Sequence, residues 1–277
     1  MTLQIKDLQV ISTQRCLLGE GIQIDKNGEI CSWVDIKSDL CFVKGNDIKK
    51  PMEYPGLVAP SKILGIDDIE MKVLHRFGIS KINLSTGRIA DLLTYSTLQN
   101  THRSNDGEIF SDGSIWYSRM GINEENGKGS IWKWNPNSPE ECMIDGLTIP
   151  NTILKLPDSE EIYFADSASG TLFLAKISSL NSSLVDVKTF AIFDDVFGVP
   201  DGSCLDALGN LWNCRWGAGM IIIVAPTGKI IEQIKLPVTY PTSCKLDPSG
   251  THLFITSANP DNSVDDFSGH TLKLTLV

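Results

Sequence analysis

Short apolar runs separated by turn residues recur along the whole chain. The runs are rich in Ile, Val, Leu, Trp and Phe, and the segments between them contain Gly, Asn, Asp and Pro. No window keeps a helical period of 3.6 residues for long, so the pattern predicts short strands rather than helices. The sequence therefore indicates an all-β protein.

A turn followed by a strand with an aromatic residue near its centre occurs repeatedly. The gap between the first two copies is about twice the later gaps, and a weaker copy at residues 69–74 restores an even period of about 46 residues. The markers of the clear copies are Trp33, Trp116, Tyr163, Trp212 and Leu253.

Six units of this length are typical of a β-propeller, in which four-stranded sheets pack face to face around a central channel. We predict a six-bladed β-propeller with a central metal site, in which residues 1–277 form a single domain. The strand-like segments 3–5 and 271–276 are expected to meet in one sheet and close the ring. A pair of β-sandwiches is the alternative, and it explains the period poorly.

The composition disfavours two kinds of binding partner and indicates the compartment in which we expect the protein. The 34 acidic and 24 basic residues give a net charge of -10, which disfavours binding to nucleic acid or to an anionic membrane. The chain starts without the features of a signal peptide, and its apolar runs are shorter than the roughly 20 residues that span a bilayer. The seven cysteines include no C-x-x-C pair, so we expect most of them to be small buried hydrophobes. We expect a cytoplasmic monomer.

Polar clusters stand at turns or strand starts in four different units. Because positions in different blades can converge only at the central channel, we expect these side chains to meet there. Their Glu, Asn and Asp oxygens suit a hard divalent cation. Calcium is favoured, with magnesium, manganese or zinc as alternatives. The clusters are residues 18–21, 102–107, 149–151 and 200–202.

The same clusters, read in order, resemble the senescence marker protein (regucalcin), gluconolactonase and luciferin-regenerating enzyme-like family. The motifs are LGEG near the start, R-x-NDG in the third unit, an Asn at the start of the fourth, PDG-x-C-x-D in the fifth, then LW-x-x-RWG-x-G and LPV-x-x-PTSC. This resemblance implies a six-bladed propeller with one divalent metal, and many family members open sugar lactones or related esters.

Carried over residue by residue, the resemblance implies that Glu20, Asn151 and Asp201 are metal ligands and that Asp201 is also the catalytic acid or base. Arg103 and Asn105 then orient the substrate. The implied activity is metal-dependent opening of a sugar-derived or related small lactone. Two alternatives keep the same site: a phosphoester or organophosphate hydrolase, and a calcium-binding propeller without catalysis.

The sequence departs from the family pattern at residues 110–114 and 118–120, which predicts an altered substrate face. We hypothesise that Arg119 points into the channel mouth and favours an anionic lactone. Thr152 stands where the family usually has a flexible Gly. Asp106 is expected to be structural, and an ion pair between Arg103 and Asp106 is the alternative to substrate contact. Core packing is the expected role of Trp216, and a place in the pocket wall is the alternative.

Overall fold

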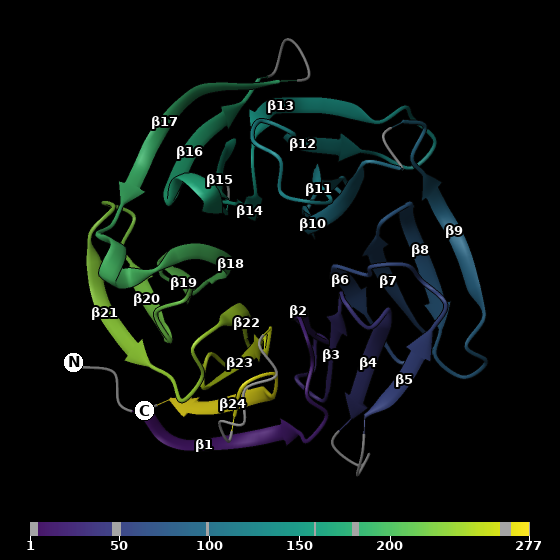
Figure 1. Cartoon of the computed structure of the whole chain (residues 1–277), viewed down its shortest axis with the longest axis horizontal. Helices are drawn as coiled ribbons and strands as arrows, with labels where there is room; N and C mark the ends of the chain where they lie inside the picture. The colour runs from purple at the N-terminus through teal and green to yellow at the C-terminus, as the bar shows by residue number, and fades with distance from the viewer. Residues whose placement is uncertain are drawn as a thin grey trace.

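The computed structural model describes residues 5–45, 51–97, 100–157, 159–178, 183–260 and 267–276. Six four-stranded antiparallel sheets are arranged in a ring around a central axis (Figure 1). The prediction of an all-β, six-bladed β-propeller is confirmed.

In blades 1 to 3, the strands follow chain order within each sheet. Blade 1 contains β2 (Gly19–Ile24), β3 (Ile30–Asp35), β4 (Leu40–Gly45) and β5 (Met52–Pro55). Blade 2 contains β6 (Lys62–Ile66), β7 (Glu70–His75), β8 (Gly78–Asn83) and β9 (Ile89–Thr94). Blade 3 contains β10 (His102–Ile109), β11 (Ile115–Gly121), β12 (Gly129–Trp134) and β13 (Glu141–Leu147).

Blades 4 and 5 repeat this order. Blade 4 contains β14 (Pro150–Lys155), β15 (Glu161–Asp166), β16 (Thr171–Ile177) and β17 (Leu184–Ile192), with the 3-10 helix η1 (Ser167–Ser169) after β15. Blade 5 contains β18 (Val199–Leu205), β19 (Leu211–Trp216), β20 (Met220–Val224) and β21 (Ile230–Lys235), preceded by the 3-10 helix η2 (Asp195–Phe197).

Blade 6 is built from both ends of the chain. It contains β22 (Pro241–Leu246), β23 (His252–Ser257) and β24 (Thr271–Leu276), and β1 (Ile5–Ser12) completes its outer edge. Ile5 lies opposite Leu276 in the antiparallel β1–β24 pair. The predicted closure of the ring in one sheet is confirmed from Ile5 onward, while Leu3 and Gln4 lie outside the described residues.

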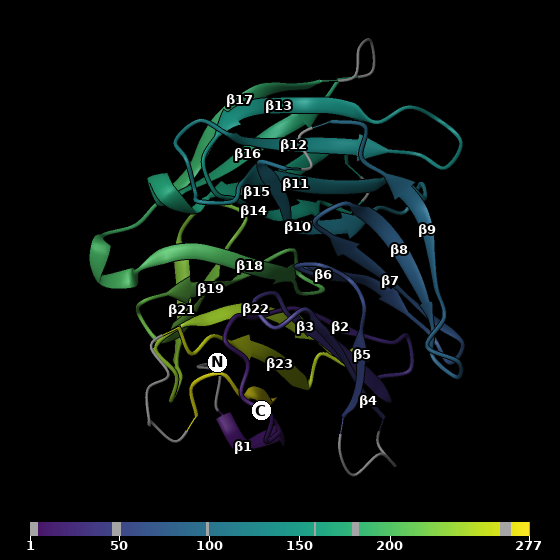
Figure 2. The ribbon, with the colours of Figure 1, turned by 45° about the vertical axis from the view of Figure 1, so that its right-hand side comes forward.

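The first strand of blades 1 to 5, together with β22 of blade 6, lines the axis. These innermost strands contact their neighbours around the ring: β2 with β6 and β22, β10 with β6 and β14, and β18 with β14 and β22. Figure 2 shows β18 and β22 running alongside each other. Strand starts from different blades therefore meet at one end of the channel.

Each of these six innermost strands has a register shift just after its start. A β-bulge of this kind bends a strand locally and re-aims its side chains. Because the shift recurs at the same level in every blade, it shapes a ring of side chains around one mouth of the channel. The shifts lie between Glu20 and Gln23, Ile63 and Gly65, Ser104 and Gly107, Asn151 and Leu154, Pro200 and Ser203, and Pro241 and Cys244.

The markers of the sequence repeat lie on the second strand of their blades, and all five are buried. Apolar clusters join neighbouring blades; one links Trp212 and Cys214 of β19 with Leu253 and Ile255 of β23. Six of the seven cysteines are buried and Cys142 is exposed, so the expectation for most of them is confirmed. The part of the chain that the structure describes contains no helix long and apolar enough to cross a membrane.

Candidate active site

The five residues that sequence analysis singles out line one pocket at the mouth of the channel. Glu20 comes from β2, Arg103 and Asn105 from β10, Asn151 from β14, and Asp201 from β18. Each stands within the first four residues of its strand, at or beside the recurring register shift. The cavity volume is about 370 Å³, a size that suits a small-molecule ligand. The predicted convergence of these side chains at the channel is thus observed.

Asp201 is buried and held in a fixed orientation. Its Oδ1 accepts hydrogen bonds from Asn151 Nδ2 at 2.8 Å and from the Gly202 amide at 3.0 Å. Asn151 Nδ2 also donates to Ser167 Oγ at 3.1 Å. Because the amide nitrogen of Asn151 is committed to these bonds, its amide oxygen is the atom available to a cation or substrate.

Asp201 is buried and Glu20 is half-buried, and the two form a pair of mutually repelling carboxyl groups. Burial, followed by the charge of Asp106, raises the pKa of Glu20. Burial also raises the pKa of Asp201, with Glu20 and then Asp106 adding to the effect. Carboxylates that share a buried site favour a proton or a cation between them. The arrangement is therefore suited to bind positive charge.

Arg103 is oriented toward the pocket by its own strand. Its Nη1 donates to Asn105 Oδ1 at 2.7 Å and to the Ser104 carbonyl at 2.9 Å. Asn105 Nδ2 in turn donates to the Pro150 carbonyl of the next blade at 3.2 Å. Asp106 pairs instead with Lys62, at 3.0 Å between Nζ and Oδ1, so the alternative ion pair between Arg103 and Asp106 is not formed.

The pocket has further walls that sequence reasoning largely missed. Lys37 lies in the turn after β3, and Glu124 lies in the turn after β11 with a positive φ of 59°. Both are charged turn residues, and their sequence neighbourhood gives no signal that separates them from other surface turns. Trp216 lines the pocket, as in the alternative to core packing, and its ring packs 4.7 Å from that of Tyr240. The site thus combines acidic, basic and aromatic surfaces.

The hypothesis that Arg119 points into this mouth is wrong. Its side chain is buried, pairs with Glu140, and lies over the Tyr95 ring at 3.6 Å and the Trp132 ring at 4.5 Å. The physical reason is its strand: β11 is the second strand of blade 3, fully buried, and Arg119 projects toward Tyr95, which follows the last strand of blade 2. Arg119 is therefore a packing residue, and it gives no basis for preference for an anionic lactone.

The structure places no complete cluster of conventional metal ligands at the mouth. Across the described ranges, no group of three or more His, Cys, Asp or Glu side chains is arranged to hold a metal ion. The oxygen donors that the lining strands bring into the pocket include the carboxylates of Glu20 and Asp201 and the amide of Asn151. The predicted metal site accordingly stays a proposal.

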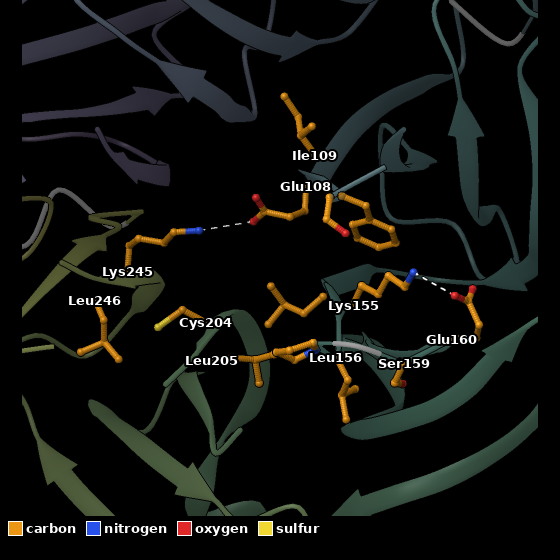
Figure 3. Close-up of a pocket in the computed structure, with 14 residues that line it drawn as sticks. Glu108, Ile109, Lys155, Leu156, Ser159, Glu160, Cys204, Leu205, Lys245 and Leu246 are labelled. Carbon is orange, nitrogen blue, oxygen red and sulfur yellow. Dashed lines mark hydrogen bonds and ion pairs between the residues drawn. The ribbon is translucent and has the colours of Figure 1, made fainter. Parts of the chain in front are cut away.

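The opposite mouth of the channel holds a second pocket of about 490 Å³ (Figure 3). Lys245 of blade 6 reaches Glu108 of blade 3, on the far side of the ring, with 3.5 Å between Nζ and Oε2. Lys155 pairs with Glu160 at 3.2 Å. Since these four charged groups pair with one another, this mouth lacks the excess of negative charge found around Asp201.

A six-bladed propeller with a pair of carboxylates at one channel mouth defines the class of this protein. The chain belongs to the SMP-30/Gluconolactonase/LRE-like family, whose model matches residues 18–259. The family predicted from the sequence motifs is confirmed, and membership of this family supports lactone hydrolysis as the activity.

Named relatives agree with this assignment over nearly the full length. The chain is 26% identical over 270 residues to a putative sugar lactone lactonase of Rhizobium meliloti, covering 93% of this chain and 89% of that protein. It is also 26% identical over 262 residues to the L-arabinolactonase of Azospirillum brasilense, covering 92% and 86%. The crystal structure of regucalcin from Agrobacterium tumefaciens, described as a calcium-binding protein, matches with a TM-score of 0.88 and 24% identity, covering 96% of this chain and 92% of that one.

Proposed function

We propose that this protein is a metal-dependent hydrolase that opens a sugar-derived or related small lactone. The observation that carries the proposal is the convergence of Glu20, Asn151, Asp201 and Arg103, from four blades, in one small pocket. The family membership and the two lactonase relatives support it. The protein would act as one domain over residues 1–277 and as a monomer on a small-molecule substrate.

The donor set fits a hard divalent cation. The carboxylates of the buried Asp201 and the half-buried Glu20 have raised pKa values and repel each other, and the amide oxygen of Asn151 adds a neutral ligand. All three donors are oxygens, a set that favours calcium, magnesium or manganese over thiophilic ions. Calcium is the favoured cation, with magnesium, manganese and zinc as alternatives. When bound, it would polarise the lactone carbonyl and compensate the negative charge that develops there.

Asp201 is the proposed catalytic acid and base. Its carboxylate takes a proton from the attacking water as the water oxygen bonds to the carbonyl carbon. The same proton then passes to the ring oxygen as the carbon–oxygen bond of the ring breaks. The bonds from Asn151 and Gly202 hold the carboxylate in place during both transfers. Burial raises the pKa of Asp201, which counteracts the loss of basicity that a bound cation would cause.

Arg103 is the proposed substrate-orienting group. Its guanidinium carries donors beyond those used by Asn105 and the Ser104 carbonyl, and these can bind sugar hydroxyls or the developing oxyanion. Asn105 acts by fixing the guanidinium plane. Trp216 and the apolar side chain of Val199 cover the pocket wall and limit the access of bulk water.

The test uses metal-stripped protein reloaded with each divalent cation and assayed on aldonolactones and on an aryl phosphoester. Asp201→Asn is expected to lower kcat on the preferred lactone by about a thousandfold, because general acid–base assistance is lost. Glu20→Gln is expected to weaken calcium binding in calorimetry by at least tenfold, an order-of-magnitude figure for one lost ligand charge. Glu108→Gln makes the same chemical change at the opposite mouth and should alter neither quantity.

Three results would contradict the proposal in different ways. Lactone hydrolysis that survives in Asp201→Asn would remove Asp201 from the mechanism. Turnover of the phosphoester but of no lactone would favour the phosphoester hydrolase. Calcium binding without turnover of any substrate would favour a non-catalytic calcium-binding propeller.

A further inference from the structure

A buried lysine lies beside the carboxylates of the site. Lys62 stands on β6 of blade 2 and is 6% exposed, and its Nζ lies 3.0 Å from Asp106 Oδ1, on a side chain that is equally buried. Asp106 also accepts a hydrogen bond from the Gly107 amide at 2.9 Å. The ion pair thus joins the innermost strands of blades 2 and 3.

The backbone of Lys62 is brought close to Glu20 by a glycine. A Cβ atom added to Gly21, the residue after Glu20, would lie 2.6 Å from Lys62 Cα, so only a residue without a side chain permits this approach of β2 and β6. The electrostatics agree with the geometry: Asp106 raises the pKa of both Glu20 and Asp201, while Lys62 lowers that of Glu20. Lys62 and Asp106 therefore act on the carboxylates of the proposed cation site.

Stability alone gives no reason for an ion pair at this place. Removing two charges from water costs as much as their attraction returns, and an apolar pair of the same volume is often equally stable in a protein interior. A buried charge next to a functional cluster has an electrostatic effect that an apolar side chain lacks. The relevant quantity is the summed charge of the cluster.

We propose that Lys62 is a positioning residue that sets the charge of the cation site. When ionised, Glu20, Asp106 and Asp201 carry three negative charges, and the ammonium group of Lys62 reduces the total to two. The total of these four groups matches the charge of one divalent cation, and the guanidinium of Arg103 adds one further positive charge at the wall of the same pocket. Without Lys62 the cluster would bind divalent cations more tightly and would favour trivalent cations still more. This inference rests on the proposed cation site at Glu20, Asn151 and Asp201.

Four proteins test it through calcium affinity rather than through turnover. The wild type and the double variant Lys62→Met/Asp106→Asn have the same net charge at the site; Lys62→Met alone adds one negative charge, and Asp106→Asn alone removes one. In calorimetric titrations with calcium chloride, we expect Lys62→Met to bind at least tenfold more tightly than wild type and Asp106→Asn at least tenfold more weakly, as order-of-magnitude figures. The double variant should lie within about threefold of wild type, since its charge is unchanged.

A second probe uses a trivalent cation. Because attraction scales with the charge of the ion, Lys62→Met should gain more affinity for terbium(III) than for calcium. Far-ultraviolet circular dichroism checks that each variant keeps its fold. If Lys62→Met does not fold, the comparison between Asp106→Asn and the double variant still measures the charge at position 62, and equal affinities of those two would overturn the proposal.

The outcomes separate this proposal from the proposed function. If wild type binds calcium and folded Lys62→Met binds equally or more weakly, the role of Lys62 is overturned and the cation site stands. If only Lys62→Met binds calcium, the role of Lys62 is supported and the metal dependence of the wild type is overturned. If none of the four proteins binds calcium, both are overturned.

Discussion

Arg119 is held by aromatic rings and one carboxylate, between blades 2 and 3. Its guanidinium lies over Tyr95 and Trp132 and pairs with Glu140. Cation–π contacts gain strength where water is excluded, as it is here. We predict that Arg119→Met lowers the free energy of unfolding by about 3 kcal/mol, because Glu140 is left partly buried without its cation. Urea unfolding followed by circular dichroism measures the change.

A matched control for Arg119→Met removes a charge from an exposed pair. Lys176 and Asp186 are 54% and 67% exposed, so Lys176→Met should change stability by less than about 0.5 kcal/mol. The ratio of kcat/KM for an acidic and a neutral lactone should be the same in wild type and Arg119→Met. A folded Arg119→Met protein with an altered ratio would show that the residue acts on specificity after all.

His75 makes the stability of blade 2 depend on pH. Burial lowers the pKa of its imidazole to about 4, against an ordinary value of about 6.5 in the unfolded chain. Its Nε2 lies 2.9 Å from Ser80 Oγ, the Ser80 hydroxyl donates to Asp91, and Nδ1 accepts a hydrogen bond from the Phe77 amide. The neutral ring satisfies all of these bonds, with Nε2 as donor.

The direction of the pH effect follows from the lowered pKa. Between about pH 6.5 and pH 4 the unfolded chain binds a proton that the folded protein does not. The stability contributed by neutral His75 is therefore complete above about pH 6.5 and is lost as the pH falls toward 4, by an amount on the order of 3 kcal/mol. Urea unfolding of wild type and His75→Gln across this range measures it; equal slopes in the two proteins would refute the prediction.

The positions of the site residues could be predicted from the sequence where these residues lie near the starts of the innermost strands. Glu20, Asn151 and Asp201 each lie near the start of an innermost strand, and a ring of such strands brings their starts together. Arg119 was not predictable, because whether a side chain points to the channel or between blades depends on which strand of the blade carries it and on the local register. Lys62 gives no signal in sequence either, since its partner Asp106 belongs to another blade.

At the scale of the strand, the bulge at the start of β14 depends on Thr152. Its φ is +56°, a left-handed conformation that β-branched residues rarely adopt, and Gly21 has a φ of +62° at the equivalent position after Glu20. The Thr152 hydroxyl donates to the Asp201 carbonyl at 2.6 Å and lies 2.9 Å from Ser203 Oγ. These bonds offset the backbone strain and tie blade 4 to blade 5.

Two substitutions separate the strain at Thr152 from the hydrogen bonds. Thr152→Val keeps a β-branched side chain and loses the hydroxyl, so we predict a loss of about 2 kcal/mol in the free energy of unfolding. Thr152→Gly loses the same bonds but relieves the strain, so it should stay within about 1 kcal/mol of wild type. Thermal and urea unfolding check the order. A Val variant at least as stable as the Gly variant would contradict this account.

At the scale of the whole molecule, the repeat length predicted six blades because each unit has to bury both faces of its sheet against neighbours. The same argument predicted closure by the chain ends, since an open ring would leave one face of the first and last blade uncovered. The argument from closure did not predict how far the closing strand β1 extends along the chain. That strand continues to Ser12, where the backbone carbonyl contacts His270 Nδ1 at 2.9 Å.

Closure through β1 leads to a prediction about chain connectivity. Removing residues 1–13 would expose the edge of β24 and uncover the core that Leu8 packs against. We predict a loss of more than about 3 kcal/mol in the free energy of unfolding, a large part of the stability of an ordinary domain. Urea unfolding measures the loss and also tests whether the transition stays cooperative.

A circular permutant tests whether the stability depends on the pairing of β1 with β24 or on the native order of the chain. Because Ile5 lies opposite Leu276, a short linker from residue 277 to residue 1, with new ends between Thr13 and Gln14, converts the β1–β24 pair into a hairpin. The permutant keeps every strand of blade 6 and should unfold within about 1 kcal/mol of wild type, since an antiparallel pair needs only a short connection. If the permutant is as unstable as the truncated protein, the stability of the ring depends on the native order of the chain rather than on the pairing of β1 with β24.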